Sequence, residues 1–459
     1  MKRTLSEFAG LTGARLVGAN AAFGDVSTDS RTLAPGSLFV ALTGPNHDGH
    51  AYVDVARERG AVAAVVAREV PGSLPQLVVP DPLEALATYA AAWRQQFEIP
   101  LVGITGSNGK TTTKELIGAM LAPLGPCHVT RGNLNNHIGV PLTLLQLARR
   151  HVTAVIEMGA NHIGEIAALA ELAAPTVGIV TNAAAAHLEG FGNLDGVAQG
   201  KGELYAALGA QGTAVINADD AYAPYWRGLT AAARVVTFGL EAAADFSARD
   251  LSVQAVTAGF RTHCVVVTPI GEAEVTLHLA GRHNLRNALG AAAAAWAAGA
   301  DLDALRAGFA AAHAVSGRLE LKPALRDAFL IDDSYNANPS SVRAGLDALA
   351  ALEGTHWLVL GEMAELGPQS RALHEEIGRH ARASGVSRLL AVGEMSRAAV
   401  AAFGPDAEWF ATVDDLIAAL RAELQAGTTV LIKGSRVNRL ERVVAALAGG
   451  DPASAANGH

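Results

Sequence analysis

Residues 101–121 read LVGITGSNGKTTTKELIGAML, an apolar run followed by a glycine-rich turn and then by a stretch of helical pattern. This order predicts a buried strand, a tight turn and the start of a helix, which is the setting of a phosphate-binding loop. In such a loop the glycines let backbone N–H groups point at phosphate oxygens, Lys110 reaches the outer phosphates and Thr111 can bind magnesium. The general GxxxxGK[ST] pattern has glycine where this chain has Ile104, so a glycine-rich surface turn before a helix stays an alternative.

A second polar residue at the end of an apolar run supports the phosphate-binding interpretation. The segment VIEMGA, residues 155–160, places Glu157 where a buried strand should end. Ligands gather at the carboxyl ends of parallel strands. Taken alone, Glu157 is more often an ordinary strand-terminal acid, but beside a phosphate-binding loop we interpret it as a magnesium ligand.

The composition is that of a compact globular enzyme. The chain has 459 residues, and since a domain takes roughly 100 to 200 residues, we expect about three domains. Hydrophobic residues make up 50% and charged residues 17%, which excludes a disordered chain. The formal charge is -9 and no run of Lys or Arg occurs, so the sequence predicts no nucleic acid partner and no attraction to anionic membranes.

Cysteine content and hydropathy bear on the cellular compartment. The two cysteines, Cys127 and Cys264, have no partner at CxxC spacing and no ligand-like histidine spacing, so neither a disulfide framework nor a zinc site is expected. The N-terminus lacks the apolar core of a secretory signal, and the Ala-rich stretch 291–300 is too short to span a membrane. We therefore expect a cytoplasmic protein without membrane insertion.

The pattern of apolar runs and turns divides the chain into three α/β domains. Residues 1–82 form a small α/β unit, which ends where Pro80-Asp81-Pro82 interrupts the pattern. In residues 83–313 continuous apolar runs alternate with helical stretches, as in a mostly parallel sheet, and residues 249–280 switch to an antiparallel pattern. Residues 314–459 repeat the strand–helix alternation and predict a Rossmann-like α/β domain. The expected strands lie at 37–42, 61–67, 76–79, 101–105, 153–158, 176–182, 212–217, 329–331, 357–360, 389–392 and 429–432.

Several motifs together resemble the Mur ligase family. The segment TGSNGKTTTKE, residues 105–115, is similar to the family's own variant of the phosphate-binding loop, in which Ile104 is no departure. The further matches cover all three expected domains: GNLNNHIGVP (132–141), EMGANHIGEI (157–166), AAHLEGFG (185–192), GRHN (281–284), SGR (316–318), DDSYNAN (332–338), GEMAELG (361–367) and KGSR (433–436).

The resemblance implies an ATP-dependent ligase of peptidoglycan synthesis. Such an enzyme uses ATP and Mg²⁺ to activate a peptide carboxylate as an acyl phosphate, which an incoming amine attacks. The first three further motifs are similar to the branch of the family that joins UDP-N-acetylmuramoyl-tripeptide to D-alanyl-D-alanine, and the DNPR segment of the neighbouring ligase is absent. Residues 1–82 would then bind the UDP end of the substrate, 83–313 would bind ATP, and 314–459 would bind the dipeptide and complete the ATP site. A monomer is expected.

The resemblance also implies roles residue by residue. The expected catalytic residues are Lys110, Glu157, His187 and Arg318, and the expected magnesium ligands are Thr111, Glu157 and His187. The expected ATP contacts are Gly106, Ser107, Asn108, Gly109, Lys110, Thr111, Thr112, Asn284, Asn287, Arg318 and Asp333. The UDP end should meet Ser30 and Arg31, and the dipeptide should meet His374, Lys433 and Ser435. Because Arg318 lies in the third domain, it can neutralise the transferring phosphate only when the domains close.

Some of these residues also have an interpretation that involves no part in catalysis or binding. Magnesium prefers oxygen, so His187 on physical grounds alone is a loop or core histidine. Asn284 could be a helix cap, and Arg318 an exposed inter-domain arginine. Lys201 stands where several relatives carry a lysine carbamylated by carbon dioxide, whose carboxylate would hold a second magnesium. An unmodified lysine paired with an acid is the alternative there.

Two other functions share the phosphate-binding loop. A folylpolyglutamate synthase uses the same loop and the same acyl-phosphate chemistry, but lacks the AAHLEGFG and GNLNN signatures. A P-loop switch would hydrolyse nucleotide to change the shape of a partner, and the guanine-specific NKxD segment of GTPases is missing from this chain. Both functions rank below the ligase.

Overall fold

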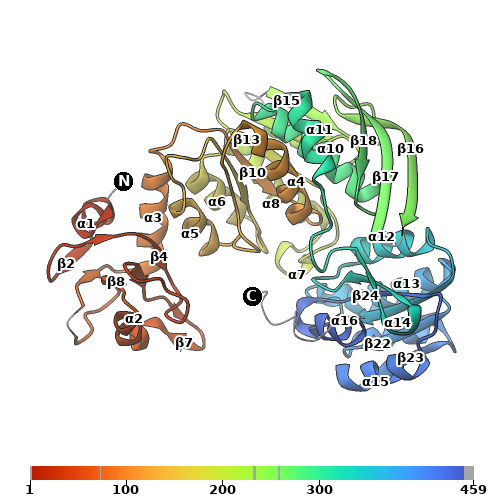
Figure 1. Ribbon diagram of the computed structural model, residues 1–459. Coiled ribbons are helices and arrows are strands. Elements are labelled where there is room, and N and C mark those ends of the chain that lie inside the picture. The colour runs from red at the N-terminus through yellow and green to blue at the C-terminus, as the bar shows by residue number, and fades with distance from the viewer. Residues whose placement is uncertain (1–2, 73, 231–233, 257–258, 449–459) are drawn as a thin grey trace.

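The computed structural model describes residues 3–72, 74–230, 234–256 and 259–448. Three α/β units follow one another along the chain, and Figure 1 shows them as an arc, with the N-terminal unit at one end and the C-terminal unit at the other. Each unit is built on its own mainly parallel sheet. The sequence predicted an α/β unit in each case and a mostly parallel sheet for the central one. Among the described residues, no helix is both long enough and apolar enough to cross a membrane.

The N-terminal unit contains a five-stranded sheet in the order β2-β9-β8-β5-β4. Only β2 runs antiparallel to its neighbour. The sheet strands are β2 (Arg15–Val17), β4 (Val26–Ser27), β5 (Leu38–Val40), β8 (Ala63–Val66) and β9 (Gln76–Val78). Two short pairs, β1 (Arg3–Thr4) with β3 (Ala22–Phe23) and β6 (Thr43–Gly44) with β7 (His47–Asp48), and the helices α1 (Leu5–Thr12), η1 (Gly49–Tyr52) and α2 (Val53–Glu58) complete it.

Helix α3 (Pro82–Arg94) joins the first unit to the second. The Asp81 side chain accepts hydrogen bonds from the first turn, and Pro82 fits that turn because its missing N–H is not needed there. Buried Leu86, Tyr89 and Trp93 lie on one face and belong to a core that includes residues of both units. The expected boundary at 82/83 thus falls at the start of α3, and the division into 1–82, 83–313 and 314–459 remains our proposal.

The central unit is built on a six-stranded parallel sheet in the order β11-β12-β10-β13-β14-β15. Its strands are β10 (Leu101–Thr105), β11 (Cys127–Val129), β12 (Thr153–Glu157), β13 (Val177–Val180), β14 (Thr213–Asn217) and β15 (Arg234–Phe238). The chain leaves β10 toward β11 and β12 on one side and returns to β13 on the other. Strand β10 therefore marks the switch point of the sheet, where ligands bind in open α/β folds.

Helices cover both faces of the central sheet, which explains its continuous apolar strands. Helices α4, α10 and α11 share a core with the sheet on one face, while α3, α5, α6 and α8 share the core on the other. The helices of this unit are α4 (Lys110–Leu121), η2 (Ala122–Leu124), α5 (Gly139–Leu145), α6 (Glu165–Ala173), α7 (Leu188–Phe191), α8 (Leu194–Ala206), α9 (Ala223–Leu229), α10 (Gly281–Ala297) and α11 (Leu302–Ala310). The antiparallel extension also forms, from β16 (Ser247–Val256), β17 (Gly259–Thr268) and β18 (Gly271–Leu277).

The C-terminal unit is a Rossmann-like α/β sheet in the order β19-β20-β24-β21-β22-β23, with only β19 antiparallel. Its strands are β19 (Glu320–Pro323), β20 (Phe329–Asp333), β21 (Thr355–Gly361), β22 (Arg388–Val392), β23 (Ala407–Phe410) and β24 (Thr428–Lys433). Its helices are η3 (Leu325–Asp327), α12 (Pro339–Ala350), η4 (Gly367–Gln369), α13 (Ser370–Ala383), α14 (Ser396–Phe403), α15 (Val413–Glu423), η5 (Arg436–Asn438) and α16 (Glu441–Leu447).

Candidate active site

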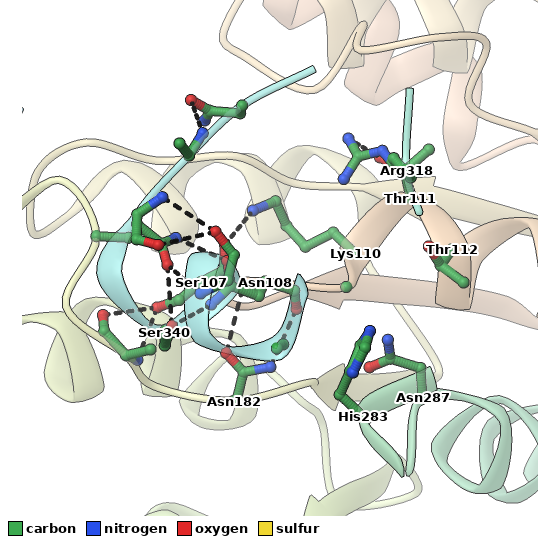
Figure 2. A pocket seen from close by; sticks show the side chains of 18 of the residues that line it. Ser107, Asn108, Lys110, Thr111, Thr112, Asn182, His283, Asn287, Arg318 and Ser340 are labelled. Atoms are coloured by element: carbon green, nitrogen blue, oxygen red, sulfur yellow. Dashed lines mark hydrogen bonds between the residues drawn. The ribbon is translucent and has the colours of Figure 1, made fainter. Parts of the chain in front are cut away.

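A cleft of about 1280 Å³ lies where the carboxyl ends of the central strands face the C-terminal unit. The loop between β10 and α4 forms one wall, and residues that follow β20 and β24 form the opposite wall. The cleft is large enough for a nucleotide together with a second substrate. Figure 2 shows Lys110, Thr111 and Arg318 on one side of the loop and His283 with Asn287 on the other.

The loop after β10 has the backbone that the glycine pattern predicted. Gly106 has φ +144, and a Cβ there would lie 1.9 Å from Thr181 Oγ1. Gly109 has φ +80, and a Cβ there would lie 2.5 Å from Asn287 Oδ1. Any larger residue would therefore clash with a neighbouring strand end or helix, in a conformation that L-residues rarely adopt. The helix α4 begins directly after Gly109, so its free N–H groups face the cleft.

Side chains of the neighbouring strand end hold this loop in place. The N–H groups of Ser107 and Asn108 donate to the backbone oxygen and to the side-chain oxygen of Asn182, at 3.0 and 3.1 Å. Ser107 Oγ donates to Ala184 O at 3.1 Å. Asn182 follows β13, so the switch point itself positions the loop. Sequence reasoning missed Asn182, although its place after an apolar strand was a usable signal.

Lys110 lies over its own loop. Its Nζ donates to Gly106 O at 2.6 Å, which brings the amine close to the backbone N–H groups of the turn. Burial lowers the pKa of this amine, and the Glu157 carboxylate opposes that shift. The amine is thus held near the place where the outer phosphates of a nucleotide would lie.

Thr111 and Glu157 form an oxygen-rich corner beside the loop. Thr111 Oγ1 donates to Glu157 Oε2 at 3.0 Å, and Asn135 Nδ2 donates to Glu157 Oε1 at 2.8 Å. Glu157 is only 1% exposed, and Lys114 Nζ lies 3.8 Å from its Oε2. A hydroxyl and a buried carboxylate are ligands that Mg²⁺ prefers, so these residues fit the expected cation. Sequence reasoning missed Asn135 and Lys114, although both lie inside the quoted motifs.

His187 lines the same cleft and contacts the C-terminal unit. Its Nδ1 contacts the Glu365 carboxylate of the C-terminal unit, and its backbone is left-handed with φ 54. That contact holds the pKa of Glu365 below its usual range. Among residues 3–72, 74–230, 234–256 and 259–448, no group of three or more His, Cys, Asp or Glu side chains is arranged to hold a metal ion. The role of His187 as a magnesium ligand beside Thr111 and Glu157 remains our proposal.

Lys201 is enclosed in the central unit, on helix α8. Its side chain is fully buried, Nζ donates to Ala160 O at 3.1 Å, and the amine lies 4.9 Å from the centre of the Phe191 ring. Burial lowers the pKa of Lys201 to about 7, and the charge of Lys110 acts in the same direction. No acidic side chain lies within salt-bridge distance of it among the described residues, so the alternative of a lysine paired with an acid is not what the structure shows.

Helix α10 supplies the polar side chains opposite Lys110. Asn287 Nδ2 donates to Asn284 Oδ1 at 3.3 Å, and Asn284 Nδ2 donates to Ala280 O at 2.8 Å. Asn284 is therefore not the helix cap, because Ala280 occupies that position. Beside them lies His283, which sequence reasoning did not single out; burial lowers its pKa to about 4, so the ring is neutral at neutral pH.

The C-terminal unit reaches into the loop from the other side. Arg318 Nη2 donates to Thr111 Oγ1 at 3.0 Å, and its guanidinium lies over the Tyr335 ring at 4.3 Å. Asn338 Nδ2 donates to Asn108 Oδ1 at 2.7 Å, and Asn108 Nδ2 donates to Ser340 Oγ at 2.8 Å. These bonds join positions more than 200 residues apart in the chain, so the structure shows the two units in contact at the nucleotide loop.

Asp333 and Lys433 form a buried ion pair at the ends of β20 and β24. Lys433 Nζ lies 2.5 Å from Asp333 Oδ2 and also donates to Asn336 O at 2.9 Å. Burial raises the pKa of the Asp333 carboxyl, and Lys433 opposes the shift. Ser435 Oγ accepts from Ala364 N at 2.9 Å. All three line the cleft, and Lys433 pairs with Asp333, which is the residue expected at the nucleotide.

Three expected substrate residues lie away from this cleft. His374 is 0% exposed, with Nε2 accepting from Met363 N at 3.0 Å and Nδ1 bonded to Ser370 O at 2.7 Å. Burial of the ring means that His374 can position the loop at Met363, but it does not face the cleft. Ser30 and Arg31 lie in the N-terminal unit, where Ser30 is buried and the exposed Arg31 pairs with Asp29 at 2.8 Å.

Comparison with known proteins identifies the family. Three family models match successive parts of the chain: "Mur ligase family, catalytic domain" over residues 23–94, "Mur ligase middle domain" over 104–295, and "Mur ligase, glutamate ligase domain" over 317–436. The class of enzyme that the phosphate loop and the three-unit fold define is that of the ATP-dependent ligases. The chain belongs to the Mur ligase family.

The chain is similar over nearly its whole length to characterised members. It is 44% identical to the UDP-N-acetylmuramoyl-tripeptide--D-alanyl-D-alanine ligase of Escherichia coli, covering 97% of this chain and 98% of that protein. It is 39% identical to the ligase of the same name from Mycobacterium tuberculosis H37Rv, covering 93% and 92%. A crystal structure of MurF from Acinetobacter baumannii matches with a TM-score of 0.90 and 33% identity, covering 97% and 98%.

Two further structures bear on the nucleotide and on the rival function. MurF ligase from Thermotoga maritima in complex with ADP matches with a TM-score of 0.79 and 26% identity, covering 92% of this chain and 96% of that one. The folylpolyglutamate synthase of Mycobacterium tuberculosis matches with a TM-score of 0.60 and 19% identity, covering 81% and 95%. The latter likeness shows a shared fold alone.

Proposed function

We propose that this chain joins D-alanyl-D-alanine to UDP-N-acetylmuramoyl-tripeptide, with ATP converted to ADP and phosphate. The observation that carries the proposal is the single cleft in which Lys110 and Thr111 of the central unit lie beside Arg318 of the C-terminal unit. The likeness to ligases of this name along nearly the whole chain supports the choice of substrates. The product is the UDP-N-acetylmuramoyl-pentapeptide.

The reaction needs two substitutions in sequence. A carboxylate oxygen of the tripeptide attacks the γ-phosphorus of ATP, the bond from that phosphorus to the bridging oxygen breaks, and ADP leaves. The dipeptide amine then attacks the acyl carbon, phosphate leaves, and the amine gives up a proton. In both steps negative charge gathers on phosphate oxygens, so positioning and cations do most of the catalysis.

The chain's own residues suit these demands. The backbone N–H groups at the start of α4 and the Lys110 amine would bind the phosphates, and Asn284 and Asn287 would face the base. Arg318 would neutralise the transferring phosphate, and Asp333 would contact the ribose. Lys433 and Ser435 are proposed to lie near the dipeptide, and Ser30 and Arg31 near the uridine diphosphate. We propose that His374 supports the dipeptide region from below, through the backbone of Met363.

Magnesium is part of the proposal. Thr111 and Glu157 would hold it from one side, and His187 would join them once its contact with Glu365 is released. The ion would supply positive charge to the β- and γ-phosphates. Lys201, if carbamylated, would offer a further carboxylate. We propose that the enzyme is a monomer and that it acts in the cytoplasm, where nucleotide-linked precursors and ATP are available.

The test is ADP release measured in a coupled assay. With magnesium and ATP, we expect ADP only when both UDP-N-acetylmuramoyl-tripeptide and D-alanyl-D-alanine are added, and we expect L-alanyl-L-alanine to be inactive. ADP release that ignores both substrates would point to a nucleotide-hydrolysing switch. ADP release with a folate and glutamate would point to the folylpolyglutamate synthase function, and no ADP under any condition would overturn the proposal.

A further inference from the structure

A second cavity, of about 740 Å³, lies apart from the active-site cleft. None of the residues that line it also lines the cleft. One wall comes from the N-terminal unit with Arg3 and Asp25. The other comes from β11 and from residues 145–151, at and after the end of α5, and Trp93 of α3 also lines the cavity. Figure 1 shows α3 and α5 next to each other at this junction of the first two units. The volume is in the range of sites for small molecules, roughly 300 to 1000 Å³.

The lining of this cavity is strongly cationic in a chain whose net charge is -9. Four arginines contribute to it, Arg3, Arg131, Arg149 and Arg150, and Asp25 is the one acidic residue among the lining residues that the structure describes. Asp25 is partly engaged, because its Oδ1 accepts a hydrogen bond from Val26 N. Within the described part of the chain, Arg131, Arg149 and Arg150 form no ion pair. Like charges gathered without counter-charges repel one another, and a bound anion would remove that repulsion.

Arg3 provides the observation that points to a ligand. The residue is 7% exposed; its Nη2 donates to Leu145 O, and its guanidinium lies 3.9 Å from the centre of the Trp93 ring. Its Nη1 is buried and has no hydrogen-bond partner among the described residues. A buried donor on a charged group is costly to leave unpaired, and native proteins rarely do so. A ligand oxygen in the cavity would satisfy it.

The histidines in the wall add a further donor. His128 Nε2 donates to Thr143 O at 2.8 Å, so that nitrogen is satisfied. His151 Nδ1 accepts from Ala148 N at 3.1 Å, which leaves the proton of the neutral ring on Nε2. The charged and polar side chains around the cavity are therefore mostly donors. A ligand that suits them offers several acceptor oxygens and negative charge, as phosphate does.

We propose that this cavity binds a phosphate-bearing small anion, with Arg3, Arg149 and Arg150 contacting the phosphate oxygens. Because its walls come from both the N-terminal unit and the central unit, the bound anion holds these two units together. The site is separate from the phosphate-binding loop, so it can be filled while the nucleotide is bound. Arginine suits such a site better than lysine because its planar fork matches two oxygens of one phosphate.

The test is calorimetric titration of the full chain with inorganic pyrophosphate in metal-free buffer. The phosphate-binding loop also takes pyrophosphate, so the titration is run on the Lys110→Ala variant as well as on the unchanged protein. We expect one binding event to persist in Lys110→Ala. Adding Arg149→Ala and Arg150→Ala should weaken that event at least about tenfold, because each charged hydrogen bond is worth about a factor of ten or more. The matched control replaces Arg227 and Arg379, two exposed arginines outside both cavities, by Ala and should change nothing.

The outcomes separate clearly. Loss of all pyrophosphate binding in Lys110→Ala, no weakening in the Arg149→Ala, Arg150→Ala variant, or equal weakening in the control would each overturn the proposal. Arg149 and Arg150 are exposed, so their replacement should leave the melting temperature without ligand unchanged. In the Lys110→Ala background, pyrophosphate should raise that temperature only when both arginines are present. Titrations with ribose 5-phosphate and with inorganic phosphate then show which kind of phosphate the cavity binds. Tighter binding of ribose 5-phosphate indicates an organic phosphate as the ligand, and equal binding of the two indicates the free ion.

Discussion

Replacing Arg318 tests whether the contact between the units serves catalysis. Its Nη2 donates to Thr111 Oγ1 at 3.0 Å, and its guanidinium is held over Tyr335, so the cation lies beside the loop that should hold the outer phosphates. In Arg318→Ala the transferring phosphate loses a charged donor. One charge-assisted hydrogen bond is worth roughly 1.5 to 3 kcal/mol, which corresponds to roughly 10- to 150-fold in rate. An arginine that neutralises a transferring phosphoryl group contributes more, roughly 10³- to 10⁵-fold.

We therefore expect Arg318→Ala to lower kcat at least about 100-fold. The affinity for ADP should change only a few-fold, because ADP lacks the γ-phosphate that the guanidinium would meet. Arg318→Lys should be intermediate, because it keeps the charge and loses the planar fork. The half-buried side chain makes one hydrogen bond, so the free energy of unfolding should fall by about 1 kcal/mol or less.

The assay is steady-state ADP release with all substrates saturating, together with calorimetric titration of ADP. The exposed arginine Arg379 lies in the same unit outside the cleft, and Arg379→Ala provides the matched control. If kcat is unchanged in Arg318→Ala, or if kcat and ADP affinity fall by the same factor, the reasoning is wrong, because Arg318 would then be a structural or ground-state contact.

Three further predictions concern single side chains. Lys110→Ala should abolish ADP release while binding of the UDP-linked substrate, measured by calorimetry, stays within a few-fold; equal loss of both would mean that the loop is structural. Activity should fall in bicarbonate-free buffer and return with added bicarbonate if Lys201 is carbamylated, and an activity indifferent to bicarbonate would argue against the modification. Burial lowers the pKa of His128 to about 4 from 6.5, so the unfolded chain binds more protons between these values and the folded state loses stability as the pH falls through this window. His128→Leu should remove this loss of stability, which is about 3 kcal/mol at most between pH 6.5 and 4. The measurement is the free energy of unfolding from urea titrations of both proteins across this pH range. Parallel pH profiles of the variant and the unchanged protein would refute the prediction.

Much of the fold could be predicted because its signals are local. The runs at 101–105 and 153–158 are buried strands within one residue of the expected bounds, since apolar residues covered on both faces need no alternation. The antiparallel pattern of 249–280 also formed strands as expected. The edge strands β11, β15, β19 and β23 of the two larger sheets were missed, because a strand with one open side carries mixed residues and resembles a loop.

Site residues could be predicted only where one short motif contains all the groups that the chemistry needs. Lys110 and Thr111 could be assigned because glycine freedom, a helix start and a cation occur within a few residues of one another. The place of His374 could not be predicted, because nothing in the neighbouring sequence shows that both ring nitrogens bond to buried backbone groups. The pairing of Lys433 with Asp333 was equally hidden, since the two residues are 100 positions apart.

The sequence by itself determined the phosphate-binding loop, the succession of three α/β units and the family, because these follow from short patterns of hydropathy, glycine and charge. Only the tertiary structure decided which distant side chains meet. Folding brings Asn108 to Asn338 and gathers Arg3 with Arg149 and Arg150 into one cationic cavity, although the chain has no run of basic residues. Such meetings depend on the path of the backbone between the residues, and no local pattern records that path.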